Sequence, residues 1–211
     1  MKTIYFEYFE LGKDVELKEF YFSPSVFILA NDCNLNLQSD FISFIEKYKR
    51  KEFGTKMYFS YIDKNEKIAW EPSINFFIPI KLPFPLFTLG AGEVLDWWFN
   101  ILSLSAEKRQ KYFEKIEVLG LKKFLNANWK DIPNHIQLIL MIIAQVLLSD
   151  ILYVFWGEKV FSQDVRDYIY QQLSLLLKGE DKNIFLFADK FKITSQVKVF
   201  KFQGFLLKDK I

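Results

Sequence analysis

Residues 144–169 read AQVLLSDILYVFWGEKVFSQDVRDYI, and this stretch decides the fold. Its first residues close an apolar segment with helical spacing, which predicts a helix over Asn134 to Ser149. Ile151 to Phe155 is a continuous apolar run, typical of a strand covered on both faces. Gln163 to Leu177 returns to helical spacing. Helix, strand and helix in this order predict a mostly parallel α/β sheet.

The remaining chain supplies both a β-rich start and a helical middle. A Pro-rich stretch, Pro79 to Pro85, separates them and indicates a subdomain boundary. Ser105 is a predicted N-cap and Gly120 lies just beyond the end of the same helix. We therefore expect one domain, residues 1–211, with a helical subdomain inserted at about 80–140. The further predicted strands are 3–11, 15–22, 26–30, 56–62, 68–70, 74–78, 183–188, 197–202 and 205–208; the further helices are 41–48, 93–102 and 105–119.

Composition excludes several classes of site. The chain has one cysteine, Cys33, and one histidine, His135, so it cannot form an internal disulfide or a Cys/His zinc site. A net charge of +2 argues against nucleic acid as a partner. The longest apolar stretch, Leu138 to Leu148, is shorter than the ~18 residues of a membrane span. The start lacks the apolar core of a signal peptide, and we expect a cytoplasmic location.

The order of elements and several local sequences resemble the ATP-binding subunit, or nucleotide-binding domain, of ABC transporters. Residues 144–154 are similar to the family's helix ending in "ARALL" and its Walker B strand. Residues 155–169 align without a gap on "DEPTSGLD" and the next helix. The resemblance covers essentially the whole chain. It implies a P-loop NTPase-like core with a mixed, mostly parallel sheet, an N-terminal antiparallel β part and an inserted helical subdomain.

The family's Walker A motif falls on DCNLNLQS, and most of its chemistry is lost. A P-loop needs glycines so that backbone N–H groups can approach the phosphates, and a lysine that neutralises their charge. Here Asp32 and Leu37 replace the two glycines, and Gln38 replaces the lysine. Ser39, the nominal magnesium hydroxyl, remains. We expect no nucleotide or metal cofactor.

The other family motifs are altered as well. The Walker B aspartate and the catalytic glutamate correspond to Phe155 and Trp156, which cannot hold magnesium or orient a water. The Q-loop glutamine falls at Pro79, the D-loop aspartate at Ser162, and the switch histidine near Asp189.

The signature LSGGQ falls on Pro133, Asn134, His135, Ile136 and Gln137. His135 and Ile136 occupy the two glycine positions, and Gln137 is the only signature residue retained. In the family, two such domains pair head to tail, and each Walker A loop faces the partner's signature. Both halves are altered here, so the resemblance implies a scaffold rather than a half-active pair.

The sequence hypothesis is a degenerate ABC ATPase-like subunit, not an enzyme, that acts as a structural or regulatory partner in a membrane transport complex. Its expected partners are a permease subunit, a second ATPase-like chain or a second copy of itself. These would hold it peripherally at the inner face of the cell membrane. Two alternatives stay open: a free-standing α/β interaction protein, and an enzyme with unconventional nucleotide chemistry on the same fold.

Individual side chains have competing interpretations. Cys33 and His135 could pair as nucleophile and base, but a lone cysteine beside a buried strand is usually inert. Trp97, Trp98 and Phe99 could form an exposed patch, although we expect two of the three to be buried.

Overall fold

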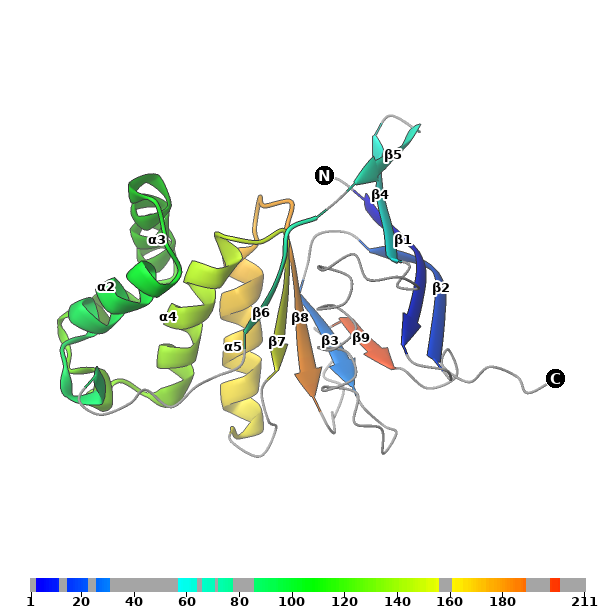
Figure 1. Cartoon of the computed structure of the whole chain (residues 1–211). Helices are drawn as coiled ribbons and strands as arrows, with labels where there is room; N and C mark the ends of the chain where they lie inside the picture. Colours follow the sequence, from blue (N-terminus) through cyan, green and yellow to red (C-terminus); the bar gives the residue numbers. More distant parts are fainter. Residues whose placement is uncertain are drawn as a thin grey trace.

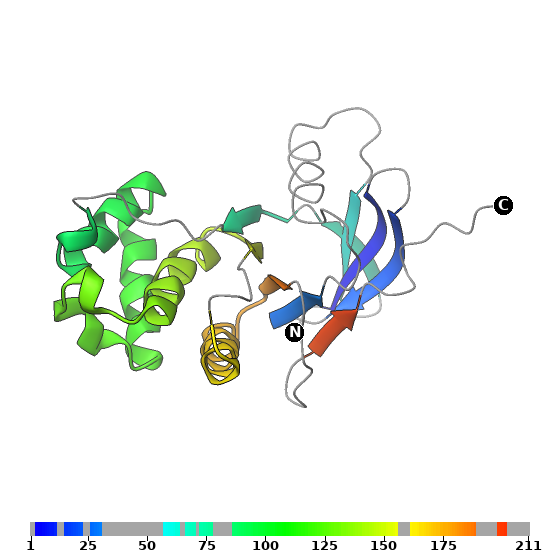
Figure 2. The same ribbon diagram turned by 90° about the horizontal axis from the view of Figure 1, so that it is seen from below.

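The protein is described by a computed structural model. It describes residues 3–11, 15–22, 26–30, 57–63, 66–70, 72–77, 86–155, 161–188 and 198–201. Figure 1 shows a parallel sheet in the middle, an antiparallel sheet on one side of it and helices on the other. Figure 2 shows the same separation from below, with the helices and the antiparallel sheet at opposite ends of the molecule.

The antiparallel sheet has the strand order β2-β1-β4-β5. The β1–β2 pairing runs from Ile4 opposite Phe22 to Leu11 opposite Val15, which confirms the predicted N-terminal hairpin. The pairing of β1 with β4 shifts register between Phe6 and Tyr8. The four strands are β1 (Thr3–Leu11), β2 (Val15–Phe22), β4 (Met57–Asp63) and β5 (Glu66–Trp70).

The second sheet has the strand order β6-β7-β8-β3-β9, and every pairing in its described residues is parallel. A parallel sheet is normally covered on both faces, which explains the uninterrupted apolar sequence of β7. The described residues of this sheet confirm the expected mostly parallel α/β architecture. Its strands are β3 (Val26–Ala30), β6 (Ile74–Phe77), β7 (Ile151–Phe155), β8 (Asn183–Ala188) and β9 (Lys198–Lys201).

The helices of the described residues lie between positions 86 and 176, interrupted by β7, and beside the parallel sheet. The α-helices are α2 (Ala91–Ile101), α3 (Ala106–Val118), α4 (Asn134–Val146) and α5 (Gln163–Leu176). The short 3-10 helices are η1 (Leu86–Thr88), η2 (Lys122–Asn126) and η3 (Trp129–Asp131). The predicted helix 41–48 and the predicted strand 205–208 lie outside the described residues.

Sequence-local caps fix the start of α2 and both ends of α3. The Ser105 hydroxyl accepts the Lys108 N–H at 3.3 Å, and Gly120 follows α3 with φ +67°, as its predicted role requires. The Glu93 carboxylate accepts the Gly90 N–H at 2.9 Å. Because Glu93 belongs to this cap, α2 starts at Ala91, two residues before its predicted start.

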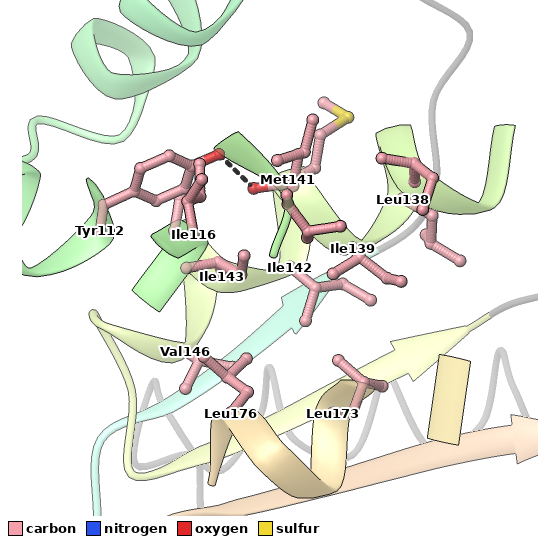
Figure 3. Packing of buried hydrophobic residues seen from close by; sticks show 14 of the residues in the cluster. Tyr112, Ile116, Leu138, Ile139, Met141, Ile142, Ile143, Val146, Leu173 and Leu176 are labelled. Atoms are coloured by element: carbon pink, nitrogen blue, oxygen red, sulfur yellow. Dashed lines mark hydrogen bonds between the residues drawn. The ribbon is translucent and has the colours of Figure 1, made fainter. Parts of the chain in front are cut away.

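Helix α4 is the centre of the hydrophobic core. Every residue from Leu138 to Val146 is buried, and Figure 3 shows its isoleucines between α3 on one side and α5 on the other. The Tyr112 hydroxyl of α3 donates to the Leu140 carbonyl at 2.9 Å, and the Trp98 indole of α2 donates to the Met141 carbonyl at 3.4 Å. These two bonds join α2 and α3 to the middle of α4.

Two side chains fix the amino ends of the parallel strands. The Asp150 carboxylate, just before β7, accepts the Ser73 hydroxyl at 2.7 Å and the Ser73 N–H at 2.9 Å. The Asp150 carbonyl accepts the N–H of Asn183, the first residue of β8. The bonds align β6, β7 and β8 at one edge of the sheet. No helix in the described part of the chain is long and apolar enough to cross a membrane.

Candidate functional site

The carboxyl edge of the parallel sheet is the candidate site. The register places Ala30 of β3 opposite Ala188 of β8, and Phe155 of β7 opposite Phe187. Strand β6 ends alongside Val154. The strands therefore end at a common edge, which is where open α/β sheets bind their ligands.

The segments that carry the predicted motifs leave the sheet at this edge. The Walker A stretch follows β3, Pro79 follows β6, Trp156 follows β7 and Asp189 follows β8. Those residues themselves, Asp32, Leu37, Gln38, Ser39, Pro79, Trp156 and Asp189, lie outside the described residues. Phe155 is placed as the last residue of β7, with only its backbone described. β3 and β8 end in alanine, β6 and β7 end in phenylalanine, and β9 ends in Lys201. The alanine and phenylalanine side chains supply no ligand for a phosphate or a cation.

The residues predicted at the signature position, 133–137, are described, and they form the start of α4. Figure 1 shows this end of α4 on the side to which β7 and β8 point. Pro133 is the N-cap, no side chain caps the helix, and the Pro133 carbonyl accepts the N–H groups of Ile136 at 2.9 Å and Gln137 at 3.1 Å. Pro133 and Asn134 are exposed.

The retained Gln137 side chain is used inside the molecule. Its Nε2 donates to the Trp129 carbonyl at 2.7 Å and to the Ile132 carbonyl at 2.9 Å. An amide nitrogen has two protons, so both are consumed by these bonds. Gln137 thus ties the η3 segment to α4. Sequence matching alone could not show this role, because the two acceptors are backbone atoms.

Of the two residues predicted at the glycine positions of the signature, Ile136 is buried and His135 is half-buried. Ile136 is buried at 3% exposure. The His135 ring stands edge-to-face with Tyr168 of α5, with 5.5 Å between ring centroids. Partial burial lowers the pKa of His135 below its usual 6.5 and raises the pKa of Tyr168. The edge-to-face contact of the imidazole with the phenol ring is a packing contact, and it had no signal in the sequence.

The other candidate sites named from the sequence are a metal site, a Cys33–His135 pair and an aromatic patch. The described residues contain no group of three or more His, Cys, Asp or Glu side chains that could hold a metal ion. Cys33, the other half of the imagined dyad, lies outside the described residues. Trp98 and Phe99 are buried, which confirms the expectation that two of the three aromatic residues are buried. Trp97 is half-buried, and its ring stacks on that of Trp98 with 6.1 Å between ring centroids.

Comparison with solved structures identifies the architecture. The protein cbiO1 from Clostridium perfringens, part of the ABC transporter complex cbiONQ, matches with a TM-score of 0.59 at 11% identity, over 94% of this chain and 83% of that chain. A protein assigned to the metal-chelate type of ABC transporters, in an inward-facing conformation, matches with a TM-score of 0.54 at 10% identity, over 89% of this chain and 73% of that chain. The chain has the fold of an ATP-binding cassette.

A third match agrees with this fold. An ATP-binding cassette of an ABC transporter, in its ADP conformation, has a TM-score of 0.50 at 15% identity, over 91% of this chain and 83% of that chain. No protein-family model matches the sequence, and the search of curated proteins finds no match. At these identities the likeness shows the fold, and the chemistry must be argued from the site itself.

Proposed function

We propose that this cassette-fold protein is a catalytically inactive subunit that acts as a structural or regulatory partner in a membrane transport complex. One observation carries the proposal: the cassette fold is present. The sequence resemblance assigns its phosphate loop to a stretch that carries Asp32, Leu37 and Gln38. A triphosphate there would meet an added negative charge, bulky side chains and no compensating lysine. Phe155 and Trp156, at the Walker B positions, supply no magnesium ligand and no general base.

The start of α4 supports the same proposal, because it concerns the nucleotide site that a paired ATPase would share with this chain. The resemblance implies that this end would face a partner's Walker A loop. The bonds of Gln137 to the Trp129 and Ile132 carbonyls occupy the signature amide, and Ile136 is buried. The side chains left exposed are those of Pro133 and Asn134. A paired ATPase would gain little phosphate recognition from them, which favours a scaffold role over a half-active pair.

The assembly is proposed from the same likeness. The matched protein cbiO1 is part of an ABC transporter complex. We infer for this chain a permease subunit, a second ATPase-like chain or a second copy as partner. Such an assembly would place it in the cytoplasm, peripheral at the inner face of the cell membrane. We also propose that residues 1–211 form one domain with the helical subdomain inserted at about 80–140.

Titration calorimetry with Mg-ATP tests the proposal. The wild-type chain should show no dissociation constant below about 100 µM, which corresponds to ~5 kcal/mol of binding. Gln38→Lys alone should not restore binding, because Asp32 and Leu37 still block the backbone cradle. A triple Asp32→Gly, Leu37→Gly, Gln38→Lys variant is the matched comparison. Tight binding by the wild type would instead favour an active nucleotide enzyme on this fold.

A further inference from the structure

The turn after α5, residues 177–182, contacts the ends of other helices as well as its own. The Glu180 N–H donates to the Leu177 carbonyl at 3.0 Å, and Gly179 takes φ +81°, a backbone conformation that favours glycine. The turn leads directly into Asn183, the first residue of β8. Of its four charged side chains, Glu180 and Lys182 contact different helices.

Glu180 reaches α3. Lys115 Nζ lies 2.6 Å from a Glu180 carboxylate oxygen and 3.4 Å from the Leu176 carbonyl at the end of α5. The side chains are 23% and 33% exposed, so the pair is partly shielded from water. The other ion pairs of α3 in the described residues, Lys111–Glu107 and Glu117–Lys122, are local and exposed. The Lys115–Glu180 pair instead joins residues far apart in the chain.

Lys182 reaches the end of α4. Its Nζ donates to the Val146 carbonyl at 2.6 Å and to the Ser149 carbonyl at 3.0 Å. The last carbonyls of a helix have no partner within the helix and carry partial negative charge, so a lysine satisfies both needs. Burial lowers the pKa of Lys182, while nearby Asp150 and Glu180 act in the opposite direction.

We propose that the turn of residues 177–182 is a clamp that fixes the orientation of α3 and α4 relative to α5 and the parallel sheet. Glu180 holds α3 and Lys182 holds the end of α4, while the turn itself is continuous with β8. In the described residues α3 is also joined to α4 by the Tyr112 bond to the Leu140 carbonyl, and to α2 by the Arg109 bond to Asn100. The clamp therefore supplies the charged attachment of the helical layer at the amino end of the sheet. It requires no nucleotide or partner, so it stands apart from the proposed function.

Hydrogen–deuterium exchange of the full chain tests the clamp through three variants. Glu180→Gln removes the charge that binds Lys115, and Lys182→Met removes the ammonium while keeping an apolar stem. Glu107→Gln is the matched control, because it breaks an exposed pair within α3. We expect amide exchange to accelerate about fivefold in α3 for Glu180→Gln, and about fivefold in the last turn of α4 for Lys182→Met. Exchange in β7 and β8 should stay within about twofold in both, and Glu107→Gln should resemble the wild type throughout.

Exchanging the charges of Lys115 and Glu180 distinguishes loss of the contact between α3 and the turn from a general loss of stability. Lys115→Glu alone should accelerate exchange in α3, and adding Glu180→Lys should restore much of the protection. Restored protection supports the clamp. The proposal is overturned if Glu180→Gln leaves α3 as in the wild type, if β7 and β8 accelerate by the same factor as α3, or if the swap restores nothing.

Discussion

At the scale of single residues, Gln137 shows how a retained motif residue can have a structural role. Its Nε2 satisfies the carbonyls of Trp129 and Ile132, two residues that are almost fully buried. The Trp129 carbonyl also accepts the Ile132 N–H at 3.1 Å, so removing the Gln137 donor takes one of two partners from Trp129 and takes the bond from the Ile132 carbonyl. Weakening buried hydrogen bonds in this way destabilises the fold. The η3 segment depends on this side chain for its position against α4.

We therefore predict that Gln137→Leu lowers the free energy of unfolding by about 1–3 kcal/mol, measured by urea denaturation. Asn134→Ala is the control, because Asn134 is exposed one turn earlier on α4, and it should change stability by less than ~0.5 kcal/mol. Equal stability of Gln137→Leu and the wild type would show that the two bonds do not hold the segment.

At the scale of elements, α4 is the helix against which α2, α3 and α5 pack. Its residues 138–146 are buried on all sides, because α2, α3, α5 and the parallel sheet contact it. Ile139→Ala, at a position with 0% exposure, should cost about 2–5 kcal/mol through lost burial and a cavity. Val118→Ala, at a position 73% exposed near the end of α3, is the control and should cost less than ~0.5 kcal/mol. A small effect at Ile139 would contradict the central position of α4.

The positions of the helices and strands were largely predictable from the sequence. The contacts between residues far apart in the sequence were not. Apolar runs gave β3, β7 and β8, and helical spacing gave α2 to α5, because these patterns are local. The predicted end of α4 at Ser149 is wrong by three residues, since the helix ends at Val146. Lys182, distant in the sequence, takes the Val146 and Ser149 carbonyls there. No local pattern encodes that contact.

For the candidate site, too, the position was predictable from the sequence and the internal contacts were not. Its position followed from the resemblance, because the motif stretches come directly after predicted strands. The internal bonds of Gln137 and the contact of His135 with Tyr168 did not, because their partners lie in other elements. The strand order β6-β7-β8-β3-β9 also has no local signal in the sequence, and it was not predicted.

At the scale of the whole molecule, buried tyrosines link stability to alkaline pH. Burial raises the pKa of Tyr112 and of Tyr153 above their usual 10.0. Their contribution is complete below pH 10 and is lost as pH rises above it, because only the unfolded chain then releases these protons. We predict a loss of about 1 kcal/mol per pH unit for each tyrosine above pH 10.

Urea denaturation between pH 9 and pH 11.5 measures this loss. Tyr112→Phe removes one of the two groups and should make the alkaline decline shallower, although it also removes the bond to Leu140 and lowers stability at pH 8. Lys182 has the opposite sign: its lowered pKa makes stability rise with pH up to the usual 10.5, and Lys182→Met should remove that rise. An identical alkaline slope for Tyr112→Phe and the wild type would show that Tyr112 is not the titrating group.

Assembly is the largest scale at which the proposed function makes a prediction. A subunit that switches with ATP must bind its partner differently in two nucleotide states. Under the proposed function, the phosphate loop carries Asp32, Leu37 and Gln38 and lacks the groups that could sense a γ-phosphate, so association should not depend on nucleotide. We predict equal recovery of a membrane partner when the tagged chain is purified from solubilised membranes with ATP, with ADP or with neither.

Ile139→Ala tests whether recovery of the partner depends on the folded chain. Because this substitution destabilises the core, it should reduce recovery equally in all three conditions. Recovery that rises with ATP would contradict a nucleotide-independent scaffold, and purification of the chain alone in every condition would favour the free-standing interaction protein.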